Sequence, residues 1–526
     1  MRFFNTAGPV KGEDHYCLPP LERFDLFEIE MLIAQKKYFV LHAPRQTGKT
    51  SYLLALSDHL NEQGKYNCLY FNVEGAQTAR ENVAEGMQAI LTEIGSWAKR
   101  RLKDPFVEGI WPGMLARSGP HAVLGQVLTE WSQNSAKPLI LLIDEIDSLV
   151  GDTLVAVLRQ LRAGYPERPD LFPQSVILCG VRDVRDYRLE FAGQEKTTDG
   201  SAFNIKAKSL RLGNFTQNEI ETLYAEHTSD TGQSFESEAL ALVWELTSGQ
   251  PWLVNALAYE VCFEMKEGRD RSKPIRVEMI NDAKERLILR RETHLDQLTE
   301  KLRQERVRRV IGPILAGSSR PDLIPEDDIL YVRDLGLIRT DRGHIEIANR
   351  IYQEVIPRAL TYSTQLTITH QTAWYVAPDG WLDMDKLLEA FQEFFRENSE
   401  VWIQRFREYH EAGPHLLLQA FLQRVVNSGG RVEREYALGS ERTDLLVTWF
   451  HPAGRQRVVI ELKIRYKGLK KTLKKALPQT YAYMDRSKTD EGHLVIFDRT
   501  KKKSWDEKIY KRSESYQGKA ITVWGV

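Results

Sequence analysis

The stretch HAPRQTGKTS, from His42 to Ser51, decides how the first part of this chain folds. It follows a short apolar run, YFVL, and precedes an apolar helical pattern, TSYLLALSDHLNEQG. A loop between a strand and a helix N-terminus points backbone N–H groups at phosphate oxygens. The pattern G-x-x-x-x-G-K-[ST] is met except at its first glycine, which allows more backbone freedom than the alanine found there. The predicted nucleotide-binding residues of this loop are Ala43, Gly48, Lys49, Thr50 and Ser51.

The side chains of this loop predict a site for ATP and Mg²⁺. Lys49 can reach the β- and γ-phosphates, and Thr50 can bind the metal. Further along the chain, PLILLIDEIDSL is typical of a buried strand that ends in acids. We expect Asp144 to hold the Mg²⁺ shell and Glu145 to orient or deprotonate the attacking water. A chance loop beside an ordinary strand end is the alternative, which the order and context of both elements disfavour.

Residues 21–215 alternate short apolar strands with longer helical patterns. The predicted strands are KYFVLHA, NCLYFNV, PLILLID and SVILCG. This rhythm predicts a parallel α/β sheet, so the fold class is α/β. The length of 526 residues implies three to four domains at about 100 to 200 residues each. The predicted parts are a P-loop core (1–215), a helical lid (216–299), a winged-helix-like domain (300–360), a helical linker region (361–404) and a C-terminal α/β domain (405–526).

Composition excludes several classes of protein. Hydrophobic residues make up 42% and charged residues 28%, as in globular proteins. The N-terminus lacks the apolar core of a signal peptide, and no apolar run approaches the roughly 20 residues of a membrane span. Four distant cysteines argue against disulfides and structural zinc. We expect a cytoplasmic protein without a membrane partner. The net charge of −1 excludes a globally basic nucleic-acid binder but leaves local basic patches possible.

A second charged site is predicted from VVIELKIRY, residues 458–466. Strand alternation places Val458, Ile460 and Leu462 on one face and Glu461 and Lys463 on the other. A half-exposed strand with a solvated face would show the same alternation. Upstream, Asp444 begins an apolar β run, and the turn HPAGRQR returns the chain into VVIELKI. Two adjacent strands would thus bring Asp444 beside Glu461, where a divalent metal gives two carboxylates a reason to be neighbours.

Downstream residues extend this second site. In LPQTYAYM, Gln479 and Tyr483 are four apart and are expected on one helical face after Pro478. Lysines that suit a nucleic-acid backbone flank the site, although a charge run is more often a solvated helix face. They are Lys467, Lys470, Lys471, Lys474 and Lys475.

The first site resembles the AAA-like branch of the STAND ATPases over residues 15–360. The resemblance rests on RQTGKTS, PPLERFD, GVRDVRDY and GQPW. It implies that Gly249 and Pro251 contact the nucleotide base, whereas a plain helix-breaking turn is the alternative from sequence. It also implies that Arg182 acts as a γ-phosphate sensor, in place of the more usual polar amide. Such proteins act as switches that release an effector, so the resemblance implies a protein trigger or a homo-oligomer.

The second site resembles the PD-(D/E)XK nucleases, and its Q-x-x-x-Y element resembles their RecB-like subset, over residues 405–510. The resemblance implies a restriction-endonuclease-like fold, a DNA substrate and Mg²⁺ or Mn²⁺ as the metal. Asp444 and Glu461 would bind the metal, and the implied catalytic residues are Asp444, Glu461, Lys463, Gln479 and Tyr483. In that family an acid on a preceding helix often completes the metal site. Glu411, with His415 four residues on, and Glu435 are the candidates, and Arg442 would contact phosphate or pair with an acid.

Together the two sites predict an ATP-hydrolysing switch that controls a metal-dependent nuclease. By analogy with STAND proteins, defence against phage or other foreign DNA is the expected role. A motor that translocates DNA into its nuclease is one alternative, disfavoured by a single P-loop and no helicase-type motif set. A non-catalytic DNA-binding regulator is the other, and the complete set of Asp444, Glu461 and Lys463 argues against it.

Overall fold

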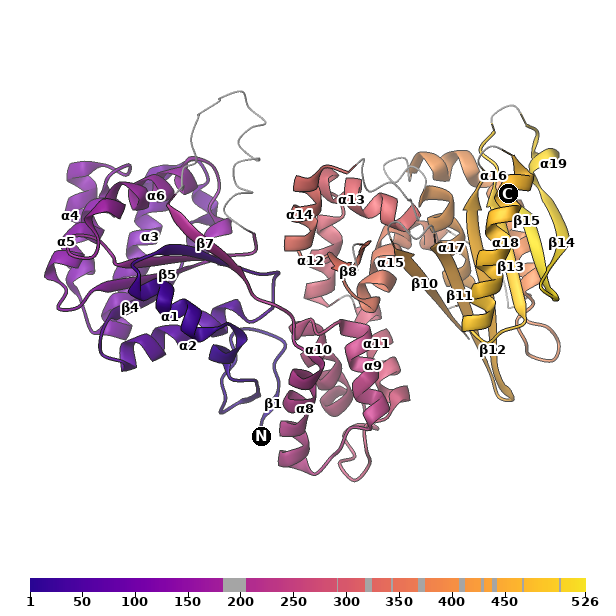
Figure 1. The fold of residues 1–526 in the computed structure, drawn as a ribbon, viewed down its shortest axis with the longest axis horizontal. Coiled ribbons are helices and arrows are strands. Elements are labelled where there is room, and N and C mark those ends of the chain that lie inside the picture. Colours follow the sequence, from indigo (N-terminus) through magenta and orange to yellow (C-terminus); the bar gives the residue numbers. More distant parts are fainter. Residues whose placement is uncertain are drawn as a thin grey trace. The chain divides into compact units, whose positions relative to one another are not determined.

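The chain forms two compact units in the computed structural model: Met1–Leu287 with Asp334–Gly336, and Ile288–Arg333 with Leu337–Val526. Each unit has its own sheet and its own hydrophobic core (Figure 1). The predicted division into five domains stays a prediction. The structure describes residues 1–182, 205–290, 292–316, 324–341, 344–367, 374–405, 412–426, 430–437, 442–465, 468–500 and 503–526.

A five-stranded sheet, parallel throughout, forms the centre of the first unit. Its strands in spatial order are β4 (Asn67–Asn72), β5 (Leu139–Asp144), β6 (Ser175–Gly180), β3 (Tyr38–His42) and β7 (Lys206–Arg211). The parallel sheet and the four strands predicted for it are confirmed. Every residue of β3, β5 and β6 is buried, because helices cover both faces of a parallel sheet. The carboxyl ends of β3 and β5 open at one edge, with β6 between them.

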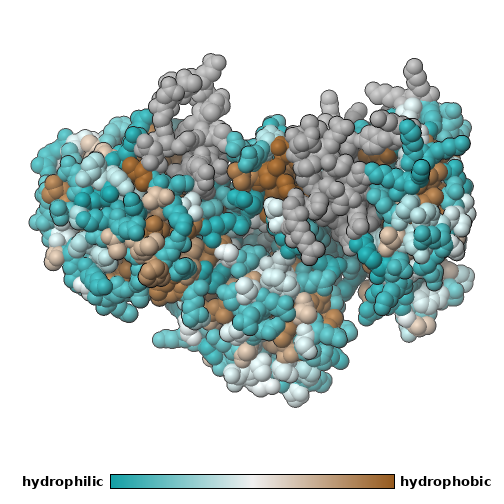
Figure 2. Space-filling model, in the orientation of Figure 1, coloured by the Kyte–Doolittle hydropathy of each residue, from teal (hydrophilic) through white to brown (hydrophobic). Residues whose placement is uncertain are grey.

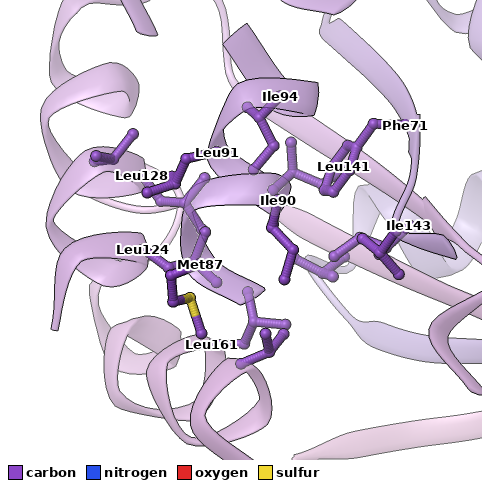
Figure 3. Packing of buried hydrophobic residues seen from close by; sticks show 14 of the residues in the cluster. Phe71, Met87, Ile90, Leu91, Ile94, Leu124, Leu128, Leu141, Ile143 and Leu161 are labelled. Carbon is purple, nitrogen blue, oxygen red and sulfur yellow. The ribbon is translucent and has the colours of Figure 1, made fainter. Parts of the chain in front are cut away.

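Helices pack on both faces of this sheet. One face carries α1 (Leu26–Ala34) and α2 (Lys49–Glu62). The other carries α3 (Val83–Trp97), α4 (Phe106–Ser118), α5 (Val123–Asn134) and α6 (Gly151–Gly164). Alternate residues of each strand serve the two cores, so Leu141 joins one and Leu142 the other. Figure 3 shows the first of these cores, where β4 and β5 meet α3, α5 and α6 through Phe71, Met87, Ile90, Leu91, Ile94, Leu124, Leu128, Leu141, Ile143 and Leu161.

Four helices follow β7 where the sequence predicts a helical segment. They are α8 (Gln217–Thr231), α9 (Ser237–Thr247), α10 (Pro251–Tyr259) and α11 (Val277–Arg290). The first begins with a capping box between Thr216 and Glu219, which satisfies two backbone donors reciprocally. The short parallel pair β1 (Phe3–Phe4) and β2 (His15–Tyr16) packs here as well, with Phe4 fully buried against Tyr16 and Tyr224.

The second unit begins with helices and a hairpin in the predicted order. Its elements are α12 (Thr293–Lys301), α13 (Glu305–Ala316), α14 (Glu326–Asp334), the antiparallel pair β8 (Ile338–Asp341) and β9 (His344–Ile347), and α15 (Arg350–Thr367). The assignment of this region as a winged helix stays a prediction. Both β9 and α15 contact the first strand of the sheet that follows.

A six-stranded mixed sheet forms the rest of the second unit. Its strands in spatial order are β10 (Gly430–Ala437), β11 (Arg442–His451), β12 (Gly454–Ile464), β13 (Glu491–Phe497), β15 (Lys519–Gly525) and β14 (Tyr510–Tyr516). The pairs β12–β13 and β13–β15 are parallel, and the other pairs are antiparallel. One face packs on α16 (Met384–Arg405) and α17 (Gly413–Val426), and the other on α18 (Leu469–Arg486).

Two predictions from the sequence concern these helices. Residues 361–404, predicted as a helical linker region, include α16, whose Leu387, Leu388 and Phe391 pack against the sheet, and the bounds of this region stay a prediction. Gln479 and Tyr483, predicted to lie on one helical face after Pro478, both lie on α18, which begins at Leu469 and contains the proline. Gly468 precedes this first turn.

The face of the molecule seen in Figure 2 is mostly hydrophilic, with hydrophobic residues in small separate patches. Among the helices that the structure describes, none has the length and apolar character needed to cross a lipid bilayer.

The turn between α9 and α10 is held against the connection from β7 to α8. Ser248 and Gly249 both have positive φ, 46° and 73°. The Phe215 N–H donates to the Gly249 carbonyl at 2.8 Å. A Cβ at position 249 would lie 1.9 Å from the Phe215 carbonyl oxygen, so only glycine fits.

Gly249→Ala should therefore lower the melting temperature of the full-length protein. We expect the free energy of unfolding to fall by roughly 2 to 5 kcal/mol, because the alanine must adopt a left-handed conformation and its Cβ overpacks against the backbone. Gly232→Ala is the matched control, since its φ is 75° but nothing lies within 4 Å of its Cβ position. The free energy of unfolding of that variant should fall by only roughly 1 to 2 kcal/mol. Equal melting temperatures for the two variants would contradict this explanation.

Candidate functional site

The loop between β3 and α2 has the backbone that phosphate binding requires. Gly48 precedes the first residue of α2 with a φ of 94°, a conformation that favours glycine. The Thr47 hydroxyl donates to the Pro44 carbonyl at 2.8 Å and fixes the turn. Ala43 is fully buried, and its N–H donates to the Gly180 carbonyl of β6 at 3.2 Å. Its φ is not positive, so the alanine fits where the pattern usually has glycine.

The Lys49 ammonium lies inside this loop. Its Nζ donates to the carbonyls of Ala43 and Pro44, both at 3.0 Å, and its side chain is nearly buried. An ammonium has three N–H donors, so one more can reach a phosphate oxygen. Ser51, one turn into α2, accepts a hydrogen bond at 3.0 Å from the Val10 N–H. That bond brings an N-terminal segment beside the loop, a contact that no local pattern in the sequence predicts.

Asp144 and Thr50 meet at the sheet edge. The Thr50 hydroxyl donates to Asp144 Oδ2 at 2.7 Å, and the Tyr70 hydroxyl donates to the same oxygen at 3.1 Å. The Glu145 N–H donates to Asp144 Oδ1 at 2.9 Å. Asp144 is fully buried, yet both of its oxygens have partners. Oxygen ligands of this kind suit Mg²⁺, so Thr50 and Asp144 fit the ion that the loop implies.

Glu145 combines an uncommon backbone conformation with a raised carboxyl pKa. Its φ of 55° is uncommon for a non-glycine residue and is found most often at functional sites. Burial raises the pKa of its carboxyl to about 7, and the nearby Asp147 and Asp144 raise it further, while the Lys49 ammonium lowers it. A carboxyl with a pKa near neutrality is suited to accept a proton from water.

Arg182 follows β6, the strand between β3 and β5. The preceding residue, Val181, donates its N–H to Asp147 Oδ1 at 3.2 Å, which ties the end of β6 to the segment after β5. The predicted γ-phosphate sensor is thus near the edge where the two motifs meet. The rest of GVRDVRDY, residues 183–187, lies outside the described residues.

Arg23 links the loop to the helical segment. It is nearly buried and donates to the carbonyls of Thr47 at 3.4 Å and Gly213 at 2.7 Å. Its guanidinium lies 4.4 Å from the ring centroid of Phe215, the residue bonded to Gly249. Burial lowers the Arg23 pKa to about 10, against the opposing charge of Glu219, so it stays charged at neutral pH.

The turn predicted to contact the base lies at the other end of this link. Gly249 and Pro251 flank Gln250, which caps α10, and Pro251 is the first residue of the helix. The Trp252 indole N–H donates to the Thr6 carbonyl at 2.9 Å. The N-terminal residues between Thr6 and Val10 therefore run from α10 to α2.

In the C-terminal sheet, Asp444 and Glu461 are direct partners across the antiparallel pair β11–β12. Glu461 is fully buried, and the Lys463 ammonium lies 2.6 Å from its Oε1. Val459, on the same face, belongs to the core that α18 covers. The alternative of a solvated face is therefore wrong for Glu461. Of Asp444 the structure describes the backbone only.

The residues of Q-x-x-x-Y lie on α18, above this face. Tyr483 is buried in the core under α18, and the Arg486 guanidinium lies 5.1 Å from its ring centroid. Gln479 Oε1 is buried and has no hydrogen-bond partner within the described part of the chain. Lys470, Lys471, Lys474 and Lys475 follow the exposed side of the helix, while Lys467 lies outside the described residues.

The third acid of this site stays a prediction. Glu435 on β10 is the register partner of Asp444. The structure describes only the backbone of Glu435 and of Arg442, and Glu411 lies outside the described residues. His415 packs 5.4 Å from the Phe497 ring, in the core on the sheet face opposite Glu461. Within the described residues, no cluster of three or more His, Cys, Asp or Glu could hold a metal ion.

The parallel sheet, the phosphate loop and the buried Asp144 together define a P-loop ATPase domain. The chain belongs to the AAA-like domain family, whose model matches residues 29–357. A search among curated proteins gave no match.

Solved structures similar to this chain include three P-loop proteins. The Walker-type ATPase PABY2304 of Pyrococcus abyssi is 16% identical, with a TM-score of 0.47 over 67% of this chain and 99% of that one. Cdc6p from Pyrobaculum aerophilum is 15% identical, with a TM-score of 0.37 over 66% and 95%. The RuvB Holliday junction branch migration motor of Thermotoga maritima is 14% identical, with a TM-score of 0.34 over 63% and 91%.

Lys49→Ala should abolish ATP hydrolysis, because it removes the ammonium that the loop holds toward the β- and γ-phosphates. The measurement is phosphate release by the full-length protein at saturating ATP. Lys65→Ala, an exposed lysine just beyond α2, is the control and should hydrolyse ATP like the wild type. Wild-type hydrolysis by Lys49→Ala would show that the nucleotide binds elsewhere.

The kcat/KM for ATP hydrolysis should fall as the pH falls through about 7, because the Glu145 carboxyl is protonated below its raised pKa and can then no longer accept a proton. The ionised fraction predicts about a tenfold decrease from pH 8 to pH 6. Glu145→Gln should bind ATP, hydrolyse it very slowly and show no such pH dependence. A wild-type profile that is flat over this range would contradict Glu145 as the base.

Proposed function

We propose that this protein is an ATP-hydrolysing switch that controls a magnesium-dependent DNA nuclease in its C-terminal sheet. The ATPase part rests on family membership and on the hydrogen bond between Thr50 and Asp144. The observation that carries the nuclease part is the register of Asp444 with Glu461, together with the buried contact of Glu461 with Lys463.

In the ATPase site each residue has a distinct task. Lys49 binds the β- and γ-phosphates, while Thr50 and Asp144 hold Mg²⁺. Glu145 takes a proton from the attacking water, and its αL backbone supports this role because it directs the residue out of the strand direction. Arg182 senses the γ-phosphate, and Gly249 and Pro251 approach the base. Because Arg23 bonds to both the loop and Gly213, a change at the phosphates can reach the helical segment.

In the nuclease site the buried carboxylate supplies a metal ligand. Bound Mg²⁺ or Mn²⁺ would lower the pKa of a water and neutralise phosphate charge. Glu461, with Asp444 opposite it on β11, would hold that ion, and the Lys463 ammonium would then be able to stabilise the negative charge of the transition state. Gln479, whose buried Oε1 has no partner in the described residues, would orient a ligand or water on this face.

The surface around this site supports a nucleic-acid substrate. The exposed lysines of α18 suit contacts to the phosphates of a nucleic acid. Phosphate contacts carry no sequence information, so these lysines would bind any sequence. ATP binding or hydrolysis would control access to the carboxylates, in response to a protein trigger or on assembly of a homo-oligomer. Defence against phage or other foreign DNA is the role that such a switch would serve.

Glu461→Gln should abolish metal-dependent DNA cleavage while leaving ATP hydrolysis intact. Lys463→Met should reduce the cleavage rate by about 10² to 10³, the scale of one electrostatic stabiliser. Both methionine and alanine remove the ammonium beside the buried Glu461 carboxylate. Methionine is preferred because it keeps nearly the side-chain volume of lysine, so the variant tests the charge without adding a cavity.

The matched control is Asp328→Asn, which alters another buried carboxylate in the same unit, held by Arg306 at 2.8 Å and Arg309 at 2.9 Å. The Asp328→Asn variant should cleave DNA at the wild-type rate. Cleavage of plasmid and linear DNA with Mg²⁺ or Mn²⁺, with and without ATP, is the assay, and thermal melts verify folding. Unchanged cleavage by Glu461→Gln would mean that its charge is structural.

A further inference from the structure

An exposed aromatic side chain lies between two arginines at one end of the C-terminal sheet. Phe450, on β11, is 42% exposed, although the residue before it, Trp449, is buried. The guanidinium of Arg431, on β10, lies 5.4 Å from the Phe450 ring centroid, and that of Arg455, on β12, lies 5.8 Å from it. Three neighbouring strands thus supply one patch.

This patch is on the same sheet face as Glu461. Arg455 is the register partner of Phe450 and precedes Glu461 by six residues on β12. An even spacing keeps side chains on one face of a strand. Arg457, between them, is exposed on this face and donates to the Ser487 carbonyl at 3.4 Å, just beyond α18. The patch and the carboxylate therefore lie on one face of β12, with Val459 buried between them under α18.

We propose that Phe450, Arg431 and Arg455 bind single-stranded nucleic acid and guide it toward the carboxylates. This inference rests on the proposed nuclease function and names its substrate class. The exposed part of the Phe450 ring offers a surface for a base, and base–aromatic stacking is tolerant of sequence. Flanking guanidiniums add phosphate contacts and cation–π attraction. In a duplex the bases are stacked on one another, so an unpaired strand or a frayed end fits the ring better.

The spacing along the strands suits this arrangement. Six residues of β12 span about 20 Å at roughly 3.4 Å per residue. Because α18 covers the direct path over Val459, that length is a minimum, and at roughly 3.4 Å per stacked nucleotide it corresponds to at least roughly six nucleotides between the base on Phe450 and the phosphate at Glu461. Oligonucleotides much shorter than this cannot reach both ends, so affinity should increase with length up to about that size.

The test measures binding without cleavage. Full-length protein is titrated into fluorescein-labelled 20-nucleotide single-stranded DNA, single-stranded RNA and blunt duplex DNA in EDTA, and fluorescence anisotropy gives each Kd. Phe450→Ala should weaken single-strand binding about tenfold, the lower part of the range for one stacked base, and leave duplex binding within twofold. Phe450→Trp should retain the single-strand affinity of the wild type. Comparing the Kd values for DNA and RNA shows which of the two single strands is preferred.

Phe27→Ala is the matched control, because Phe27 on α1 is 74% exposed and lies in the other unit. It should bind like the wild type. Single-strand affinity that is unchanged in Phe450→Ala, or that falls equally for strand and duplex, would overturn the proposal. Since no metal is present, the result is independent of catalysis. Loss of binding in Phe450→Ala with no cleavage by the wild type would instead reject the nuclease function and keep the binding site.

Discussion

The hydrogen bond between Thr50 and Asp144 is the interaction on which the rest of the first unit depends. It joins the first turn of α2 to the last residue of β5, although 94 residues separate the two. It can form only because β3, β6 and β5 run parallel and end at one edge. A fully buried carboxylate is costly unless its oxygens are hydrogen-bonded, and here Tyr70 and the Glu145 N–H complete the set. The same geometry turns Glu145 out of the strand direction, beside Lys49.

A second constraint couples this edge to the helices that follow. Arg23 bonds to the loop carbonyl of Thr47 and to Gly213, and it stacks on Phe215. The N-terminal segment adds a separate connection, from Trp252 to Ser51. Two independent links between the phosphate loop and α10 mean that the loop cannot shift without a response in the helical segment. The proposed nucleotide switch would need such coupling, because its ligand must make different contacts in two states.

Local signals in the sequence were enough to predict the central sheet and its loop. Apolar runs of four or five residues mark β3, β4, β5 and β6, because a strand buried on both faces has little room for polar side chains. The chain holds no local signal for Tyr70, whose hydroxyl matters only once β4 lies beside β5, nor for the partners of Arg23, which come from distant segments. The spacing of Gln479 and Tyr483 predicted a shared helical face but no helix bounds, and α18 begins before Pro478, at Leu469, because the lysine-rich turns are helical too. The membership of α16 in the core became visible only with its tertiary packing.

The opposite charges in VVIELKIRY can be explained by comparing the two faces of β12. Val458, Ile460 and Leu462 fill the core under α16 and α17, while Val459 packs under α18, so neither face is an ordinary solvated one. A buried ion pair seldom stabilises a fold more than apolar side chains of the same size would. Two leucines at positions 461 and 463 would therefore satisfy the packing at least as well. Stability alone gives no reason for Glu461 and Lys463 to be there, and the proposed metal-dependent cleavage would account for a carboxylate held in register with Asp444.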